Sequence, residues 1–143
     1  MHKILFVCHG NICRSTMGEQ ILKDMVKKAG KEEEFFIDSA AVSREEIGNP
    51  IYMPARRELM KHGVEPGNHR ARQITRQDYE KFDRIYYMDR SNERYLSRML
   101  PADPEKIRPL LTREVADPWY TGDFEATWRD LTEGCRRIME DMK

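Results

Sequence analysis

The chain has 143 residues, with 25 Lys and Arg, 25 Asp and Glu, and a formal net charge of zero at pH 7. This balance argues against a broad nucleic-acid or membrane-surface footprint, and the opening apolar run is too short for a membrane span or an export signal. The length fits one domain spanning residues 1–143. Three cysteines, an odd number without an export signal, favour reduced thiols in the cytoplasm over a disulfide framework.

Four apolar runs are typical of strands, and amphipathic patterns typical of helices lie between and after them. Strands are predicted at residues 3–8, 35–40, 84–88 and 107–110, and helices at residues 15–29, 54–63, 75–82, 91–100 and 124–142. Because strands that alternate with helices form right-handed crossovers, this order predicts an α/β fold with a parallel sheet. Ligands bind beyond the carboxyl ends of such strands, where Cys8 and the segments of Asp89 and Asp117 should converge.

The loop between the first predicted strand and helix carries the strongest functional signal. It runs Cys8, His9, Gly10, Asn11, Ile12, Cys13, Arg14 and Ser15. A helix N-terminus offers unpaired N–H groups and a positive dipole end, which together bind anions, and it favours the thiolate form of a nearby cysteine. Arg14 would hold two oxygens of a phosphate, while the amides of residues 9–15 and the Ser15 hydroxyl would hold the rest. Gly10 and Asn11 both tolerate the left-handed backbone that an anion-binding nest requires.

A hydrophobic cysteine, a nucleotide-binding loop, a redox pair and a metal site each fit this segment less well. A buried, merely hydrophobic cysteine would not need Gly, Asn, Arg and Ser around it. A Walker A loop needs a second glycine followed by lysine, where this chain has Cys13-Arg14, and a thioredoxin-type pair has the shorter spacing C-x-x-C. Cys8, His9 and Cys13 are residue types that bind metals, but no second ligand cluster follows them in the sequence.

Displacement at phosphorus also needs a proton for the leaving oxygen, and Asp117 is the candidate donor. Pro118 keeps Asp117 out of helical conformation, and a carboxylic acid there would protonate the leaving group and then activate water. An Asp-Pro pair by itself is more often a turn. Trp119 and Tyr120 would form either a flat wall against an aromatic substrate or contacts that anchor the loop.

These motifs resemble those of the low-molecular-weight protein tyrosine phosphatases. The resemblance is carried by Val7-Cys8-x-Gly10-Asn11-x-Cys13-Arg14-Ser15 and by Asp117-Pro118-Trp119-Tyr120, and shorter blocks extend it nearly from end to end. It implies a four-stranded parallel sheet with helices on both faces. It also implies hydrolysis of phosphotyrosine, an aryl phosphate monoester, without a metal or other cofactor. The implied partners are phosphotyrosine-containing proteins or peptides, with phosphate, vanadate or sulfate as active-site anions, and no nucleic acid or membrane.

The resemblance assigns chemical roles around the first loop. Cys8 would form a phosphocysteine intermediate, Arg14 would bind the phosphate, and Asp117 would be the general acid and base. Ser15 would stabilise the Cys8 thiolate when the intermediate breaks down. Cys13 would be a redox partner, forming a reversible disulfide with Cys8 that protects it from over-oxidation.

Supporting roles follow from the same resemblance. Asn11 would hold the loop in shape through hydrogen bonds to Ser39 and His69, although from the residues alone these two could equally make ordinary polar contacts. Cys135 lies on the apolar stripe of the last predicted helix, so we expect it to be structural.

The chain departs from the family pattern at the pocket rim and in the first helix. His9 stands where an apolar residue is common, and Glu45, in the substrate-pocket wall, stands where eukaryotic members tend to carry an aromatic residue. Together with Arg44 and Glu46 this makes the rim charged and leaves substrate preference open. Gly18, where alanine is commoner, should weaken its helix by up to about 1 kcal/mol.

Three other functions remain open on the sequence alone. Arginine-phosphate phosphatases resemble the chain but usually have threonine where Ile12 stands. Arsenate reductases of related fold share a C-x-x-x-x-C-R-S loop but require two further cysteines after the third strand, and here only Cys135 remains. A phosphoprotein-binding or redox-sensing module without turnover would not need Cys8, Arg14 and Asp117 together. The sequence therefore favours a cysteine-dependent phosphotyrosine phosphatase.

Overall fold

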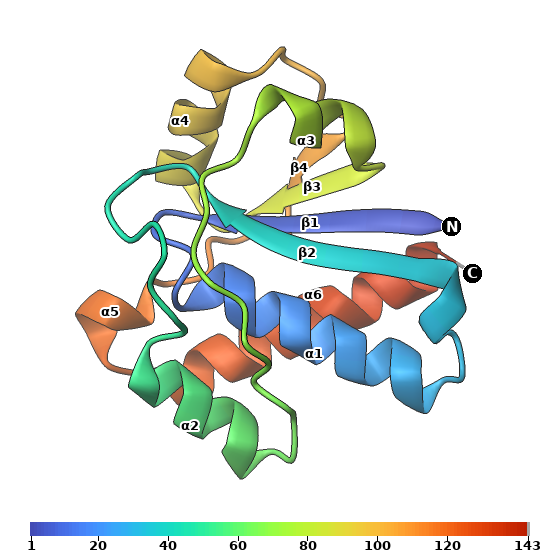
Figure 1. The fold of residues 1–143 in the computed structure, drawn as a ribbon, viewed down its shortest axis with the longest axis vertical. Coiled ribbons are helices and arrows are strands. Elements are labelled where there is room, and N and C mark those ends of the chain that lie inside the picture. The colour runs from blue at the N-terminus through green and yellow to red at the C-terminus, as the bar shows by residue number, and fades with distance from the viewer. Residues whose placement is uncertain (143) are drawn as a thin grey trace.

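A four-stranded parallel sheet, with strand order β2-β1-β3-β4, forms the centre of the molecule. The structure is a computed structural model that describes residues 1–142. The strands are β1 (His2–Cys8), β2 (Phe35–Ala41), β3 (Arg84–Tyr87) and β4 (Ile107–Pro109). The helices are α1 (Arg14–Lys28), α2 (Met53–Lys61), α3 (Arg76–Lys81), α4 (Arg90–Met99), α5 (Pro118–Thr121) and α6 (Phe124–Asp141), and a 3-10 turn, η1 (Glu32–Glu34), precedes β2 (Figure 1).

The predicted α/β fold, with its parallel sheet and helices on both faces, is confirmed. The ends of the predicted strands and helices differ from those observed by no more than two residues. Two short elements were not predicted, namely the 3-10 turn η1 and the single-turn helix α5. Both are too short to show the apolar periodicity on which such predictions depend.

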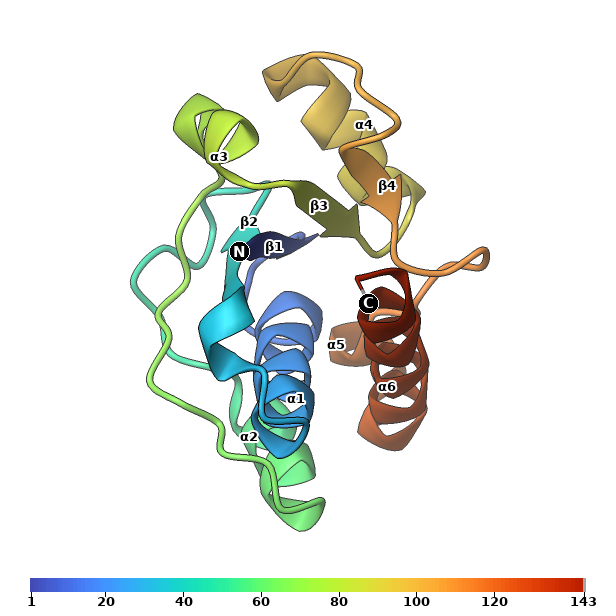
Figure 2. The same cartoon turned by 90° about the vertical axis from the view of Figure 1, so that its right-hand side faces the viewer.

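The sheet separates two layers of helices (Figure 2), and an apolar cluster lies on each side of it. Helices α1, α2 and α6 cover one face, and α3 and α4 cover the other. Because side chains alternate along a strand, Ile4 and Phe6 of β1 point into the first layer while Leu5 and Val7 point into the second. All four of these side chains are fully buried. The strand that ends at Cys8 is thus held rigidly from both sides.

Two glycines allow helices to approach the sheet closely. A Cβ atom on Gly18 would lie 3.1 Å from Cδ1 of Phe6, so this glycine lets α1 pack directly on the Phe6 ring. The destabilisation of the helix that is expected from Gly18 is therefore offset by the closer packing of α1 on the sheet. A Cβ atom on Gly134 of α6 would lie only 2.4 Å from Cγ of Leu110, which any larger residue would displace.

The carboxyl ends of the strands lie at one edge of the sheet, and three segments meet there (Figure 1). They are the loop after β1, the start of α4 after β3, and the segment after β4 that leads into α5. Contacts between Arg14 and both Asp89 and Asp117 join the three segments. Within residues 1–142, the helices are all too short or too polar to span a membrane.

Candidate active site

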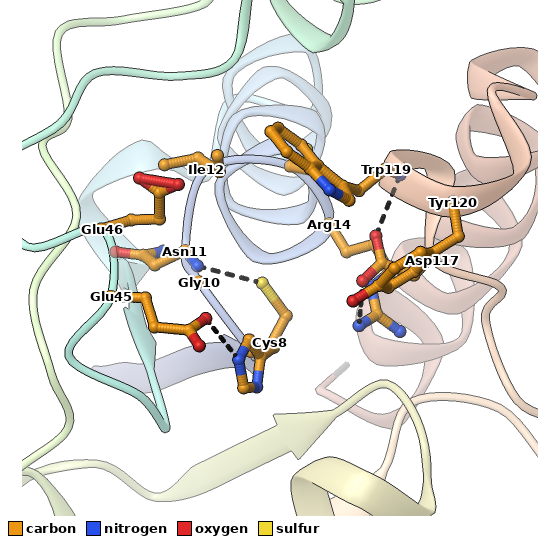
Figure 3. Close-up of a pocket in the computed structure, with 12 residues that line it drawn as sticks. Cys8, Gly10, Asn11, Ile12, Arg14, Glu45, Glu46, Asp117, Trp119 and Tyr120 are labelled. Atoms are coloured by element: carbon orange, nitrogen blue, oxygen red, sulfur yellow. Dashed lines mark hydrogen bonds and ion pairs between the residues drawn. The ribbon is translucent and has the colours of Figure 1, made fainter.

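A pocket of about 150 Å³ opens at this edge, directly above the end of β1 (Figure 3). The loop between β1 and α1 forms its floor, and the segments before α2 and within α5 form its walls. Its lining comprises Cys8, His9, Gly10, Asn11, Ile12, Cys13, Arg14, Glu45, Glu46, Asp117, Trp119 and Tyr120. The structure therefore brings the whole predicted loop except Ser15 into contact with one cavity, together with Asp117 and the predicted wall residues.

The sulfur of Cys8 is surrounded by hydrogen-bond donors. The backbone N–H groups of Asn11 and Ser15 both point at Sγ from 3.4 Å, and the Ser15 hydroxyl lies 3.0 Å from it. Cys8 is buried, with 3% of its surface exposed. Donors arranged in this way stabilise a negative charge on sulfur more than they stabilise a neutral thiol. Ser15 thus belongs to the site although it lies behind the sulfur rather than on the pocket surface.

Asn11 has the left-handed backbone that turns the loop amides inward. Its φ is +64°, and residues 1–142 contain no other non-glycine residue with positive φ. Gly10, which also tolerates this conformation, does not have a positive φ. A Cβ atom at position 10 would lie 3.3 Å from Cγ of Glu46, so a larger residue there would require a small shift of that side chain.

The side chain of Asn11 holds this conformation in place. Its amide nitrogen donates to the Ser15 hydroxyl at 2.7 Å and to the Ser39 hydroxyl at 3.0 Å. Its oxygen lies 2.7 Å from Nε2 of His69 and accepts from the backbone N–H of Arg72 at 3.2 Å. The structure thus brings Asn11, Ser39 and His69 together in one buried network. Every polar atom of the Asn11 side chain has a partner there.

A buried carboxylate behind this network was not predicted. Glu19 of α1 is only 2% exposed, and it accepts from the Ser39 hydroxyl at 2.5 Å and from Lys23 at 2.6 Å. Glu19, Asp38 and His69 offer ligand atoms within 4.8 Å of one another, a spacing that metal sites also show. The two oxygens of Glu19 are already engaged by a hydroxyl and an ammonium group. These contacts fit a structural support for the loop.

The guanidinium group of Arg14 is held at the bottom of the pocket. One of its terminal nitrogens donates to Asp89 and to the backbone oxygen of Val115, both at 2.7 Å, and the other lies 3.4 Å from Asp117. Burial by itself would lower the pKa of Arg14, but the charges of Cys8 and Asp117 and the hydrogen bond to Asp89 raise it above its usual value. Arg14 is therefore a fixed cation beside the sulfur.

Asp89 was expected near this edge, but its direct part in the site was not predicted. It caps the N-terminus of α4 by accepting from the backbone N–H of Asn92 at 2.8 Å, and its other oxygen accepts from Arg14. The available signal was an aspartate that follows a strand and precedes a helix, at the edge where ligands bind. A capping role alone accounts for that pattern, so the second contact could not be inferred.

Asp117 lies across the pocket from the first loop. Its Oδ1 accepts from the backbone N–H of Trp119 at 3.0 Å, which makes it the N-cap of α5. The Trp119 ring rests against Tyr52, with 4.7 Å between ring centroids, and 52% of Trp119 remains exposed. Tyr120 is 83% exposed. Pro118 begins a helical turn, so the Asp-Pro pair marks a helix start as well as a bend.

The opposite side of the mouth is acidic. Nε2 of His9 lies 2.7 Å from a carboxylate oxygen of Glu45, and the His9 ring packs edge-on against Tyr95. Glu46 accepts from the side-chain amide of Asn49 at 2.7 Å. The charged rim expected from the sequence is present, and the two glutamates face Trp119 and Tyr120 across the opening (Figure 3).

The three cysteines are free and buried, but only two belong to the pocket. Burial raises the pKa of the Cys13 thiol, and the neighbouring charges of Cys8 and Asp117 raise it further. Cys135 lies apart in α6, where burial raises its pKa and its thiol donates to the backbone oxygen of Gly18 at 3.6 Å. Its surroundings are those of a core residue.

A loop of inward-facing amides at a strand end, a cysteine sulfur among them and a carboxylate on the facing wall are the arrangement expected of a phosphatase. Comparison with known proteins agrees. Residues 3–143 match the family described as low molecular weight phosphotyrosine protein phosphatase. A protein of that name from Pongo abelii is 38% identical over 96% of this chain and 93% of its own length.

Solved structures give the same result. The crystal structure of YfkJ from Bacillus subtilis has a TM-score of 0.95 and 35% identity, and the match covers 99% of this chain and 94% of that chain. The crystal structure of an arginine phosphatase from Drosophila has a TM-score of 0.86 and 33% identity, covering 99% and 98%. The chain belongs to the low molecular weight phosphotyrosine protein phosphatase family.

Proposed function

We propose that this protein hydrolyses phosphotyrosine in proteins and peptides through a phosphocysteine intermediate on Cys8. One observation carries the proposal: the Cys8 sulfur is surrounded by loop donors at the floor of a pocket whose far wall presents Asp117. The fixed cation of Arg14 lies between them. Family membership supports the same reaction class. Nucleophile, phosphate cradle and proton donor are thus available within one cavity.

Binding of the phosphate uses groups that are already in place. The amides of residues 9–15 line or underlie the pocket floor, and the helix dipole of α1 favours a dianion there. Asp89 and the Val115 carbonyl hold one terminal nitrogen of Arg14, so the other nitrogen faces the pocket. Because this arrangement exists before substrate binds, little reorganisation is needed on binding.

In the first chemical step, the Cys8 thiolate attacks phosphorus and the bond to the phenolic oxygen breaks. Asp117, protonated in the enzyme–substrate complex, gives its proton to that oxygen so that tyrosine leaves as a neutral phenol. Phosphate is then bound to sulfur. Trp119 and Tyr120 lie beside Asp117, where the leaving aromatic ring would contact them.

In the second step, Asp117 acts as a base. It accepts a proton from water, whose oxygen attacks phosphorus and displaces Cys8 as thiolate. The Ser15 hydroxyl, 3.0 Å from Sγ, stabilises the sulfur as it becomes negative again. Inorganic phosphate leaves, Asp117 is protonated again, and the enzyme returns to its starting state. Every proton and bond is accounted for without a metal or other cofactor.

We also propose Cys13 as the redox partner of Cys8. A peroxide would oxidise the Cys8 thiolate to a sulfenic acid, which the Cys13 thiol attacks to form a disulfide and release water. The raised pKa of Cys13 supports this order of events, because Cys13 remains a thiol while Cys8 is the group that reacts first. Three free thiols support a reducing, cytoplasmic location.

The similarity to the Drosophila arginine phosphatase favours phosphoarginine as a second candidate substrate. Ile12 argues for phosphotyrosine, because its aliphatic side chain lines the pocket where threonine is usual in the arginine-phosphate enzymes.

The test is to measure phosphate release from matched phosphotyrosine and phosphoarginine peptides by the protein and by Cys8→Ser. We expect turnover of the phosphotyrosine peptide and loss of activity in Cys8→Ser with the fold retained. Undiminished activity in Cys8→Ser would refute the nucleophile. Faster release from phosphoarginine would transfer the proposal to that substrate.

A further inference from the structure

The mouth of the pocket carries two adjacent glutamates that the proposed reaction does not use. We call Glu45 and Glu46 the acidic rim. They belong to the segment between β2 and α2, and in Figure 3 they lie across the opening from Trp119 and Tyr120. A phosphotyrosine ring entering between these walls would place its own polypeptide backbone beside the acidic rim.

The acidic rim is fixed with respect to Cys8. The backbone N–H and the hydroxyl of Ser43 both donate to the backbone oxygen of His9, at 3.1 Å and 2.9 Å, which ties the start of the segment to the first loop. The backbone N–H of Tyr52 donates to the oxygen of Ile12 at 2.9 Å, which ties its end to the same loop. The backbone that carries the two carboxylates is therefore anchored to the loop that holds Cys8.

Each rim carboxylate retains an oxygen for a partner outside the chain. Glu45 uses its Oε2 with His9, and Glu46 uses its Oε2 with the neutral amide of Asn49. Among residues 1–142, no hydrogen bond or ion pair engages either Oε1. Because its partner is uncharged, Glu46 keeps its full negative charge at the mouth.

Positive and negative charges lie at different depths in the pocket. Arg14, the only Lys or Arg in the lining, is 2% exposed at the bottom, where the phosphate would neutralise it. Glu45 and Glu46 supply two carboxylates nearer the mouth. Arg44 adjoins the rim but does not line the pocket. A substrate thus meets positive charge at its phosphate and negative charge at the residues beside it.

We propose that the acidic rim selects phosphotyrosine sequences with lysine or arginine next to the phosphorylated residue, and disfavours those with aspartate or glutamate there. This inference rests on the proposed phosphotyrosine activity and specifies its substrate class. Partly exposed ion pairs of this kind change binding by about two- to fivefold per charge, and salt weakens them. Glu46 contributes more than Glu45, whose charge His9 partly offsets when protonated.

The test compares kcat/KM for three phosphotyrosine peptides that differ only at the two flanking positions, which are Lys, Gln or Glu. At low ionic strength we expect the Lys peptide to exceed the Gln peptide by about two- to fivefold, and the Gln peptide to exceed the Glu peptide by a similar factor. Ratios within one enzyme preparation cancel any change in basal rate. Raising the salt concentration should compress both ratios.

Variants assign the preference to the acidic rim. Glu46→Gln should lower the Lys-to-Glu ratio more than Glu45→Gln does, and Glu45→Lys with Glu46→Lys should invert it. The matched control is Glu33→Gln with Glu34→Gln, which removes two exposed charges from η1 at the opposite end of β2 and should leave the ratio unchanged.

The outcomes separate this inference from the function on which it rests. Equal kcat/KM for the three peptides, or a preference that survives in the rim variants or changes equally in the control, overturns the inference while phosphotyrosine turnover stands. Absence of turnover with every peptide and with para-nitrophenyl phosphate overturns both.

Discussion

The floor of the pocket and its Asp117 wall are built in opposite ways. The floor loop between β1 and α1 is buried and densely bonded: Asn11 alone makes four hydrogen bonds through its side chain, to partners in α1, in β2 and in the segment before α3. The Asp117 wall stands on the single turn of α5, and its aromatic residues are largely exposed. The proposed phosphate-binding side is therefore preorganised, whereas the proposed leaving-group side can change with little cost to the fold.

The largest separation of activity from stability is expected at Asp117. In Asp117→Asn, kcat for phosphotyrosine should fall by about 10²- to 10⁴-fold, because the proposed acid is lost. The free energy of unfolding should change by less than about 0.5 kcal/mol, because asparagine retains an acceptor for the Trp119 N–H. Steady-state kinetics and urea unfolding measure the two effects. For an aryl phosphate with a better leaving group, kcat of Asp117→Asn should fall less. An equal fall in kcat with both esters would contradict the acid role.

In the buried floor loop, activity and the free energy of unfolding should fall together. Asn11→Ala removes four side-chain hydrogen bonds and places alanine at a φ of +64°, so we expect a loss of about 2 to 4 kcal/mol in unfolding free energy along with reduced kcat/KM. Asn11→Gly is the control that tolerates the backbone but lacks the bonds. If Asn11→Gly is as stable as the wild type, the network does not support the loop.

The contacts that support the floor loop from outside should make the stability of the fold depend on pH. Burial alone would raise the pKa of Asp78, but hydrogen bonds from Arg72 and Thr75 lower it, and Arg72 in turn supports Asn11. A lowered pKa means that the carboxylate stabilises the fold above its unfolded pKa of about 3.9 and loses this effect as pH falls through the folded value.

Asp78→Asn should therefore cost about 1 to 2 kcal/mol at pH 7 and progressively less as the solution becomes more acidic than about pH 4. Urea unfolding at neutral, mildly acidic and strongly acidic pH measures the difference. A constant difference at all three values would show that the loss comes from the cap of α3 and not from the charge.

The smallest effect is expected at the exposed wall. Tyr120→Ala should leave stability within about 0.5 kcal/mol of the wild type and raise KM for phosphotyrosine peptides by about two- to tenfold, through loss of an aromatic contact. Steady-state kinetics with peptide and with inorganic phosphate as inhibitor check this. A weaker inhibition by phosphate would place Tyr120 in the phosphate cradle instead of the ring-binding wall.

The contrast between the floor loop and the Asp117 wall also bears on what could be predicted from the sequence. Long apolar patterns indicated the strands and helices, and the loop motif placed Cys8 and Arg14 at the strand edge, because both signals are local in sequence. The contacts of Glu19, Asp89 and Glu45 depend on segments that lie far away along the chain. A glutamate on an amphipathic helix or an aspartate before a helix has an ordinary local role, so its long-range partner leaves no mark in the pattern.

Family resemblance supplied the link among Asn11, Ser39 and His69, which periodicity could not have given. It did not supply the packing role of Gly18, which depends on the position of the Phe6 ring. Residue type could not show which of Gly10 and Asn11 adopts the left-handed conformation, because both tolerate it; in the structure it is Asn11.

Arg14 and Asp117, which lie 3.4 Å apart in the pocket, are separated by 103 positions along the chain. A ribosome adds roughly 5 to 20 residues each second, so Cys8 is made roughly 5 to 20 seconds before Asp117. Throughout that interval the nascent polypeptide carries the proposed nucleophile without the proposed acid, and α6 has not yet covered one face of the sheet. Newly made chains can therefore acquire the proposed activity only after the segment of Asp117 has been synthesised, when the two distant sections are first joined.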